Sequence, residues 1–260
     1  MINLKIPEHA YFYGLMLTDG HLSEIDRNRG KLSIELKAED SDLIHKISKL
    51  FPVHCNVRTR IRSTNFQKDA KSVLAAWYSY ELRIEMKQLG FPVGRKSDII
   101  EKPIGNFCEV DFVRGLIDGD GSVCYSAAGL PIIGFTTKSE AMKNYFANFL
   151  VRAINHQTHI TKNRRDNVYN FCINGIAAKL LYQQLYYPKC LCLERKRLDS
   201  FLNYKPNKMV PNNRGPNWTK TDDEYLLTHT IDESLKFFKN RSVSAVKTRL
   251  WRVQHLKCRP

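Results

Sequence analysis

The chain has 260 residues, of which 43% are hydrophobic, which is enough apolar side chain for a sizeable core and excludes a wholly disordered protein. Its 41 Lys and Arg residues against 26 Asp and Glu give a net charge of +15, so we expect a polyanionic partner. No long apolar run is present, and residues 1–7 do not show the basic segment followed by an apolar segment that is expected of a signal peptide. We therefore expect nucleic acid rather than a membrane as the partner, and a location in the cytoplasm or an organellar matrix.

The seven cysteines are odd in number and form no C-x-x-C pattern, which is typical of reduced thiols in an intracellular protein. Cys190 and Cys192 have no second pair at zinc-ligand spacing, so no structural zinc is expected.

The first predicted helix follows Pro7, which suits a first helical turn, and residues 10–17 are apolar on nearly every side. Gly14 inside this helix costs about 1 kcal/mol relative to Ala. That cost is understandable if a second backbone approaches closely there. The helix ends on Thr18-Asp19-Gly20, so it delivers a carboxylate to its own C-terminal end.

Residues 31–37 and 56–62 alternate in polarity, which predicts two strands. A helix over 41–51 with Ser41 as its N-cap separates them, and a strand over 73–82 and a short helix over 85–90 follow. Cations share one face of each alternating strand: Lys31 and Lys37 in the first, and Arg58, Arg60 and Arg62 in the second. A solvated surface is one reading, but like charges at alternate positions repel unless an anion covers them.

The same order of elements returns from about Gly105. Asp111 is expected to cap a helix over 112–117, followed by a strand over 132–137, a helix over 139–151 and strand-like basic segments at 158–162 and 164–165. The motif Gly115-Leu-Ile-Asp-Gly-Asp120-Gly121 matches Gly14-Leu-Met-Leu-Thr-Asp19-Gly20 at a constant offset of 101 residues. Such a repeat predicts two halves on a pseudo-twofold axis, each helix, two strands, helix, two strands, helix.

Residues 205–217 are rich in Pro, Asn and Gly and read as a linker. Residues 218–260 predict three helices, with a capping box from Thr221 to Glu224 and Ser242 as the cap of the third. This segment resembles a Myb/SANT-like helix-turn-helix DNA-binding domain, in which the third helix would enter a major groove. Trp218 and Trp251 are expected in its core; a small packing module is the alternative.

The two Asp-Gly motifs resemble the paired signature motifs of a single-chain LAGLIDADG homing endonuclease, over residues 6–204. The first copy departs from the pattern at Leu17, where an aspartate usually stands, but both copies keep the later aspartate. A calcium loop is a poor alternative, because Gly129 stands where the twelfth-position Glu would be. The resemblance implies an α+β fold of two αββαββα halves, 1–104 and 105–204, with saddle-shaped antiparallel sheets along the DNA major groove.

The resemblance also implies the site. Asp19 and Asp120 would hold Mg²⁺ or Mn²⁺ together with the backbone carbonyls of Thr18 and Gly119, while Gly14 and Gly115 form the helix interface. Lys96 and Lys196, which end two Arg-Lys pairs 100 residues apart, would lie in the active-site pocket. The alternative is that each pair is simply a basic turn near a helix end. The candidate DNA contacts are Lys31, Lys37, Arg58, Arg60, Arg62, Lys138, Lys162, Arg164, Arg165, Lys247, Arg249 and Arg252.

The resulting hypothesis is a monomeric, metal-dependent enzyme that cuts both strands of double-stranded DNA at a specific site. We expect a free-standing or intron-encoded enzyme rather than an intein. Two alternatives remain open on the same scaffold: a maturase that assists intron splicing, and a DNA-binding regulator without cleavage.

Overall fold

The computed structural model describes residues 2–25, 29–62, 69–206 and 218–256. The chain forms two compact units, Met1–Lys205 and Pro206–Pro260. Within the described ranges, no helix has the length and apolar character needed to cross a bilayer.

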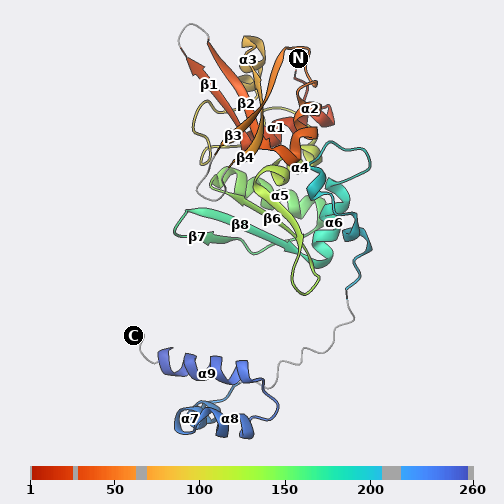
Figure 1. Ribbon diagram of the computed structural model, residues 1–260. Coiled ribbons are helices and arrows are strands. Elements are labelled where there is room, and N and C mark those ends of the chain that lie inside the picture. Colours follow the sequence, from red (N-terminus) through yellow and green to blue (C-terminus); the bar gives the residue numbers. More distant parts are fainter. Residues whose placement is uncertain (1, 26–28, 63–68, 207–217, 257–260) are drawn as a thin grey trace. The chain divides into compact units, whose positions relative to one another are not determined.

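The first unit contains two halves with the same order of elements (Figure 1). The first half comprises α1 (Pro7–Asp19), β1 (Gly20–Ile25), β2 (Arg29–Lys37), η1 (Ala38–Asp40), α2 (Ser41–Ile47), β3 (Cys55–Arg62), β4 (Ala70–Trp77) and α3 (Tyr80–Gln88). The second comprises α4 (Glu109–Asp120), β5 (Gly121–Tyr125), β6 (Pro131–Thr137), α5 (Glu140–Ile154), β7 (Thr161–Asn163), β8 (Val168–Asn174) and α6 (Gly175–Leu185), followed by η2 (Glu194–Lys196) and η3 (Asp199–Asn203). The predicted α+β fold with two αββαββα halves is confirmed.

Each half contains one antiparallel four-stranded sheet, in the order β1-β2-β4-β3 and β5-β6-β8-β7. Alternation along the strands gives each sheet two different faces. Leu32, Ile34 and Leu36 of β2 are buried on one face, which the helices cover. The residues between them, Lys31, Ser33, Glu35 and Lys37, point to the opposite face, which we call the open face.

Helices α1 and α4 cross at their glycines and form a contact between the halves. A Cβ atom on Gly14 would lie 2.2 Å from the carbonyl oxygen of Phe112, and one on Gly115 would lie 2.3 Å from the carbonyl oxygen of Tyr11. Neither position has room for a side chain. Residues His9 through Leu17 are all buried, as expected for a helix that is apolar on every side.

Several predicted boundaries in the first half were wrong. The strand predicted over 73–82 runs only from Ala70 to Trp77, because Ser79 starts a new helix. The Ser79 hydroxyl accepts a hydrogen bond from the Leu82 amide at 3.1 Å, which caps α3. Ser41 is the first residue of α2 rather than its N-cap, and α2 ends at Ile47.

The prediction that Asp111 caps the fourth helix was also wrong. Helix α4 begins at Glu109, and Asp111 lies buried inside its first turn. Its carboxylate accepts hydrogen bonds from the Arg114 guanidinium at 2.5 Å and from the Tyr187 hydroxyl at 2.6 Å. Arg114 is fully buried, so Asp111 supplies the countercharge that such a guanidinium requires.

The second unit contains three helices, α7 (Lys220–Thr228), α8 (Ile231–Phe237) and α9 (Val243–Leu256). The predicted capping box at Thr221 was placed two residues late, since the box is formed by Thr219 with Asp222; a second box joins Thr230 and Glu233. Ser242 caps α9 as predicted, because its hydroxyl accepts a hydrogen bond from the Ala245 amide. Of the predicted linker 205–217, residues 207–217 lie outside the described residues.

The two tryptophans of this unit have different environments. Trp218 is half-buried, 5.2 Å from the Phe238 ring, with the Arg241 guanidinium 4.4 Å from its centroid. Trp251 is 58% exposed, so its predicted core position was wrong. The register of α9 is the reason: Val246 is buried against the other helices, and five residues further along Trp251 is turned away from them.

Candidate functional site

The ends of α1 and α4 meet at one point. A Cβ atom on Gly119 would lie 1.8 Å from the hydroxyl oxygen of Thr18, so the two helix ends touch there. Asp19 and Asp120 are the last residues of these helices, directly after Thr18 and Gly119. The crossing at Gly14 and Gly115 therefore brings the two predicted aspartates together, although they are 101 residues apart in the chain.

The pKa values of the two carboxylates are shifted by burial and by the charges around them. Partial burial and the negative charge of Asp120 raise the pKa of Asp19 to about 6, against the attraction of Lys196 and Lys96. Burial also raises the pKa of Asp120, which the two lysines oppose. Both aspartates nevertheless remain exposed at the surface, where a ligand can reach them.

Lys96 and Lys196 lie behind the aspartates and bind the C-terminal carbonyls of the two helices. The Lys96 ammonium donates to the carbonyl oxygens of Leu17 at 2.7 Å and Thr18 at 2.8 Å. The Lys196 ammonium donates to the carbonyl oxygens of Ile117 and Asp118 at 2.7 and 2.5 Å, and to that of Gly121 at 2.9 Å. A cation at this position satisfies the free carbonyls and the negative end of each helix dipole.

Burial shifts the protonation of both lysines. It lowers the pKa of Lys96, and it lowers the pKa of Lys196 to about 8, despite the opposing attraction of Asp118. A lysine with a pKa near 8 can exchange a proton at neutral to mildly alkaline pH. Its neighbour Arg195 holds the other half of the unit, since its Nε lies 3.1 Å from both carboxylate oxygens of Asp40.

Replacing Lys196 with Met is expected to lower the free energy of unfolding by about 2–4 kcal/mol, because three carbonyl oxygens lose a buried charged donor. Urea titration followed by circular dichroism measures the change. Lys102→Met is the matched control, since Lys102 is exposed and its replacement should change stability by less than about 0.5 kcal/mol. Equal stability of the two variants would show that Lys196 does not support the helix end.

The earlier motif aspartate of the second copy, Asp118, is fully buried. Its carboxylate accepts hydrogen bonds at 2.7 Å from the hydroxyls of Tyr11 and Tyr186 and from the Leu193 amide. It thereby ties α4 to α1 and to the segment that carries Lys196. Leu17, the corresponding residue of the first copy, is buried among apolar side chains and makes no such link.

A pocket of about 180 Å³ lies beside the aspartates and includes Lys96, Asp120 and Lys138. Ser97 and Thr136 also line it, and the sequence analysis missed both. The Thr136 hydroxyl donates to the backbone carbonyl of Asp120 at 3.0 Å. Ser97 could have been predicted as a pocket residue because it directly follows Lys96 in the sequence. Nothing in the sequence links Thr136 to Asp120.

Of the cations predicted on the first sheet, Lys31, Lys37, Arg58 and Arg60 lie on its open face, and they differ in exposure and pairing. Lys37 and Arg58 are exposed and Lys31 is half-buried. The Arg60 guanidinium forms an ion pair with Glu35 at 2.9 Å, so part of its charge is already neutralised. Arg62 ends β3, and its side chain lies outside the described residues.

The cations predicted on the second sheet are more dispersed. Lys138 is exposed at the end of β6, but Lys162 lies opposite Tyr169 and shares the face of Phe171, which the helices cover. Its ammonium is 4.8 Å from the centroid of the Tyr169 ring. Arg164 and Arg165 are exposed in the turn between β7 and β8, where Arg165 pairs with Asp166 at 2.9 Å.

In the second unit, Lys247 and Arg252 are exposed on α9. Arg249 instead faces α7, where its Nε and one terminal nitrogen each lie 2.7 Å from an oxygen of Asp223. This two-point pair joins α9 to α7. Arg249 therefore has a structural role that its basic character did not reveal.

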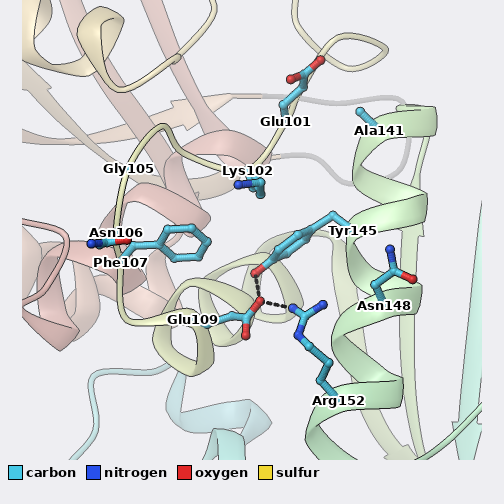
Figure 2. A pocket seen from close by; sticks show the side chains of 10 residues that line it. All are labelled: Glu101, Lys102, Gly105, Asn106, Phe107, Glu109, Ala141, Tyr145, Asn148 and Arg152. Carbon is cyan, nitrogen blue, oxygen red and sulfur yellow. Dashed lines mark hydrogen bonds and ion pairs between the residues drawn. The ribbon is translucent and has the colours of Figure 1, made fainter.

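A second, wider pocket of about 780 Å³ lies at the start of α4 (Figure 2). Glu109 in this pocket accepts hydrogen bonds from the Tyr145 hydroxyl and the Arg152 guanidinium. Glu109 opens α4 and Asp120 closes it, so the two sites are roughly 16 Å apart along the helix. Because this pocket lies at the other end of α4 and Glu109 is already paired, we assign it no part in the chemistry at Asp19 and Asp120.

Comparison with known proteins supports the two-half fold. The sequence profile of the LAGLIDADG-like domain family matches residues 108–202. The homing endonuclease I-WcaI, solved bound to its DNA recognition sequence, is similar over 76% of this chain and 88% of its own, with a TM-score of 0.57 and 16% identity. No curated protein sequence matches the chain.

Two further solved structures are similar at lower scores. Mesophilic variants of the homing endonuclease I-DmoI match 74% of this chain and 96% of their own, with a TM-score of 0.47 and 14% identity. The N-terminal LAGLIDADG domain of DUF199/WhiA matches 72% and 85%, with a TM-score of 0.47 and 16% identity. Residues 108–202 therefore carry the pattern of a LAGLIDADG-like domain, and Met1–Lys205 has the fold of the LAGLIDADG homing endonucleases.

Proposed function

We propose that this protein is a LAGLIDADG homing endonuclease, a metal-dependent enzyme that cuts both strands of DNA at a specific site. The observation that carries the proposal is the pairing of Asp19 and Asp120 at the touching ends of α1 and α4. Partial burial, together with repulsion by the nearby carboxylate of Asp120, raises the pKa of Asp19 to about 6. A divalent cation bound between the two carboxylates would offset this repulsion.

The donor set fits a hard divalent cation such as Mg²⁺ or Mn²⁺, because such ions prefer carboxylate and carbonyl oxygens. Asp19 and Asp120 would hold the ions, with the backbone carbonyls of Thr18 and Gly119 as further donors. The Thr18 carbonyl oxygen also accepts a hydrogen bond from the Lys96 ammonium. A carbonyl oxygen has two lone pairs, so it can accept this hydrogen bond and also bind a metal ion. Bound there, the metal would lower the pKa of a water molecule and neutralise charge at the phosphate.

The remaining chemistry falls to the lysines and to the pocket beside Asp120. With its pKa lowered to about 8, Lys196 can hold or release a proton near the attacking water. Lys96 lines the pocket of Asp120 and adds positive charge where a phosphate would gain negative charge. Thr136 fixes the backbone of Asp120 through its hydroxyl.

We assign the binding of double-stranded DNA to the face of each sheet that the helices do not cover and to the second unit, as a helix-turn-helix extension. Lys31, Lys37, Arg58 and Lys138 supply long cationic side chains that reach phosphates or guanine edges. One chain carries both aspartates, so a monomer can contain a complete site.

The proposal is tested by cleavage selection on a randomised duplex library, with Mg²⁺ and with EDTA. We expect one asymmetric target to be enriched among cleaved molecules with Mg²⁺, and no cleavage with EDTA. If no library molecule is cleaved under any divalent ion although the protein binds duplex DNA, the maturase or the regulator is favoured instead. Deletion of residues 206–260 separates these further, because a regulator dependent on the helix-turn-helix would lose binding while the nuclease would still cut.

Metal affinity is expected to fall as the pH drops through about 6. The folded protein binds a proton at Asp19 more tightly than a free aspartate does, so between pH 6 and 4 this carboxylate is protonated while an ordinary one is ionised. Protonation competes with the metal. Calorimetric titration with Mn²⁺ at pH 7.5 and at pH 5 measures the affinity. We expect the affinity at pH 5 to be weaker by about tenfold or more. An affinity independent of pH would place the metal elsewhere.

A further inference from the structure

Two cysteines lie side by side in the loop between α6 and η2, a few residues before Lys196. The Cys192 thiol donates a hydrogen bond to the Cys190 sulfur, and both side chains are buried in the core. All six cysteines within the described ranges are free thiols. A buried cysteine usually behaves as a small apolar core residue, so burial alone assigns this pair no function.

A guanidinium distinguishes the pair from ordinary core thiols. One terminal nitrogen of Arg197 lies 3.2 Å from the Cys190 sulfur and 3.4 Å from the Cys192 sulfur. Arg114 adds a second positive charge, which the Asp118 carboxylate opposes. The hydrogen bond from Cys192 and the charges of the two arginines lower the pKa of the Cys190 thiol despite its burial. Cys190 therefore forms thiolate at neutral pH more readily than an ordinary cysteine does.

A thiolate beside a second thiol is the arrangement that oxidises to a disulfide. With hydrogen peroxide as the oxidant, the Cys190 thiolate attacks one peroxide oxygen, the O–O bond breaks, and hydroxide leaves and takes up a proton. The Cys192 sulfur then attacks the sulfenic acid: the S–S bond forms, the S–O bond breaks, and the hydroxyl leaves as water with the Cys192 proton. Two thiols and one peroxide thus give one disulfide and two waters. The positive charge of Arg197 disfavours a metal cation on the same sulfurs.

Backbone groups around the pair hold the segment that leads to Lys196. The Leu191 carbonyl oxygen accepts a hydrogen bond from the Arg114 Nε at 2.8 Å. The Leu193 amide donates to the Asp118 carboxylate at 2.7 Å. A disulfide across the pair would close a small ring around the peptide groups of Leu191, and its preferred dihedral angle would turn those groups out of their present orientation.

We propose that Cys190 and Cys192 form a redox site in which peroxide closes a disulfide, displaces the segment that carries Lys196 and thereby stops DNA cleavage. The effect on cleavage rests on the proposed function, whereas the disulfide and the displacement do not. A small thiol such as dithiothreitol reverses the change by thiol–disulfide exchange.

Peptide mass spectrometry of the full chain tests the disulfide. The protein is treated with one equivalent of hydrogen peroxide, alkylated with iodoacetamide and digested with trypsin, which releases residues 190–195 as one peptide. We expect this peptide to lose two hydrogen atoms and to escape alkylation. Cys124 and Cys172 are exposed but have no cysteine two residues away, so both should still be alkylated. Oxidation of these exposed thiols before the buried pair would overturn the proposal.

Variants of Arg197 test whether its charge activates the pair. Arg197→Met is expected to slow disulfide formation by about tenfold and to raise the pH at which Cys190 is half alkylated, because the thiolate loses its guanidinium partner. Arg197→Lys keeps a positive charge and is the matched control, which should recover most of the rate. Equal rates and equal pH profiles in all three proteins would contradict the activation of Cys190 on which the proposal depends.

Hydrogen exchange and plasmid cleavage measure what the disulfide does. On oxidation, exchange of the Leu193 amide should become about tenfold faster, and cleavage should fall by about tenfold and return with dithiothreitol. Cys190→Ser lacks the reactive thiol and should show neither change. A disulfide that alters neither exchange nor cleavage would overturn the proposal. A chain that never cleaves, yet forms the disulfide and exchanges faster, would refute the nuclease and leave the redox site standing.

Discussion

Replacing Asp120 with Asn is expected to abolish double-strand cleavage, with a loss of about a thousandfold or more, and Asp19→Asn should do the same. The amide keeps the size of the side chain but removes the charge that a divalent ion requires. Because the two carboxylates lie at one point, each variant damages the whole site and not merely one half of it.

DNA binding by these variants should remain within about threefold of the wild type, since no cation that contacts phosphate is lost. Supercoiled plasmid carrying the selected target separates nicked from linear product, and a gel-shift assay in EDTA measures affinity. Asp42→Asn, an exposed acid at the start of α2, is the control and should cleave normally. Undiminished linear product from Asp120→Asn would refute the proposed site.

Asp120→Asn should also make the metal-free protein more stable at neutral pH. Asp120 raises the pKa of Asp19, so in the absence of metal the two charges oppose folding. Removing one charge removes that repulsion. A lower melting temperature of metal-free Asp120→Asn at pH 7.5 would contradict this electrostatic account.

Gly115→Ala is expected to destabilise the first unit by about 2–3 kcal/mol. In an isolated helix the same change would stabilise by about 1 kcal/mol, so the sign of the effect distinguishes the crossing from ordinary helix propensity. The reason is steric: the added Cβ would lie 2.3 Å from the Tyr11 carbonyl oxygen and 2.7 Å from the Leu15 nitrogen, which are backbone atoms that cannot move alone.

Cleavage should fall in Gly115→Ala as well, by about a hundredfold, because separating the helices displaces Asp19 from Asp120. Thermal unfolding and plasmid cleavage measure the two effects. Asn144→Ala, at an exposed position inside α5, is the matched control, and its higher helix propensity should leave stability unchanged or slightly raised. An increase in stability for Gly115→Ala would mean that the helices do not cross at this glycine.

The repeat made most of the fold predictable. Two glycine-containing apolar helices ending in Asp-Gly at a constant offset predicted two equivalent halves, and strict alternation in residues 31–37 located a strand. Boundaries were less predictable where a local cap competed with the hydrophobic pattern. Ser79 starts a helix inside a segment whose pattern predicts a strand. Asp111 stands where a helix cap is predicted, but its carboxylate accepts a hydrogen bond from the buried Arg114 guanidinium instead.

The sequence by itself determined which residues carry the proposed chemistry, because the aspartates Asp19 and Asp120 repeat at an offset of 101 residues and the lysines Lys96 and Lys196 at an offset of 100. Such a repeat can be recognised without a structure. Only the tertiary structure decided what each basic residue does. Arg60, Arg249 and Lys162 resemble free cations in the sequence, but they pair with Glu35, Asp223 and the Tyr169 ring. Such partners lie on other strands and helices, so they are set by packing between distant segments, which local pattern does not encode. The outward turn of Trp251 was decided in the same way, by the buried Val246 and the contact of Arg249 on the far side of α9.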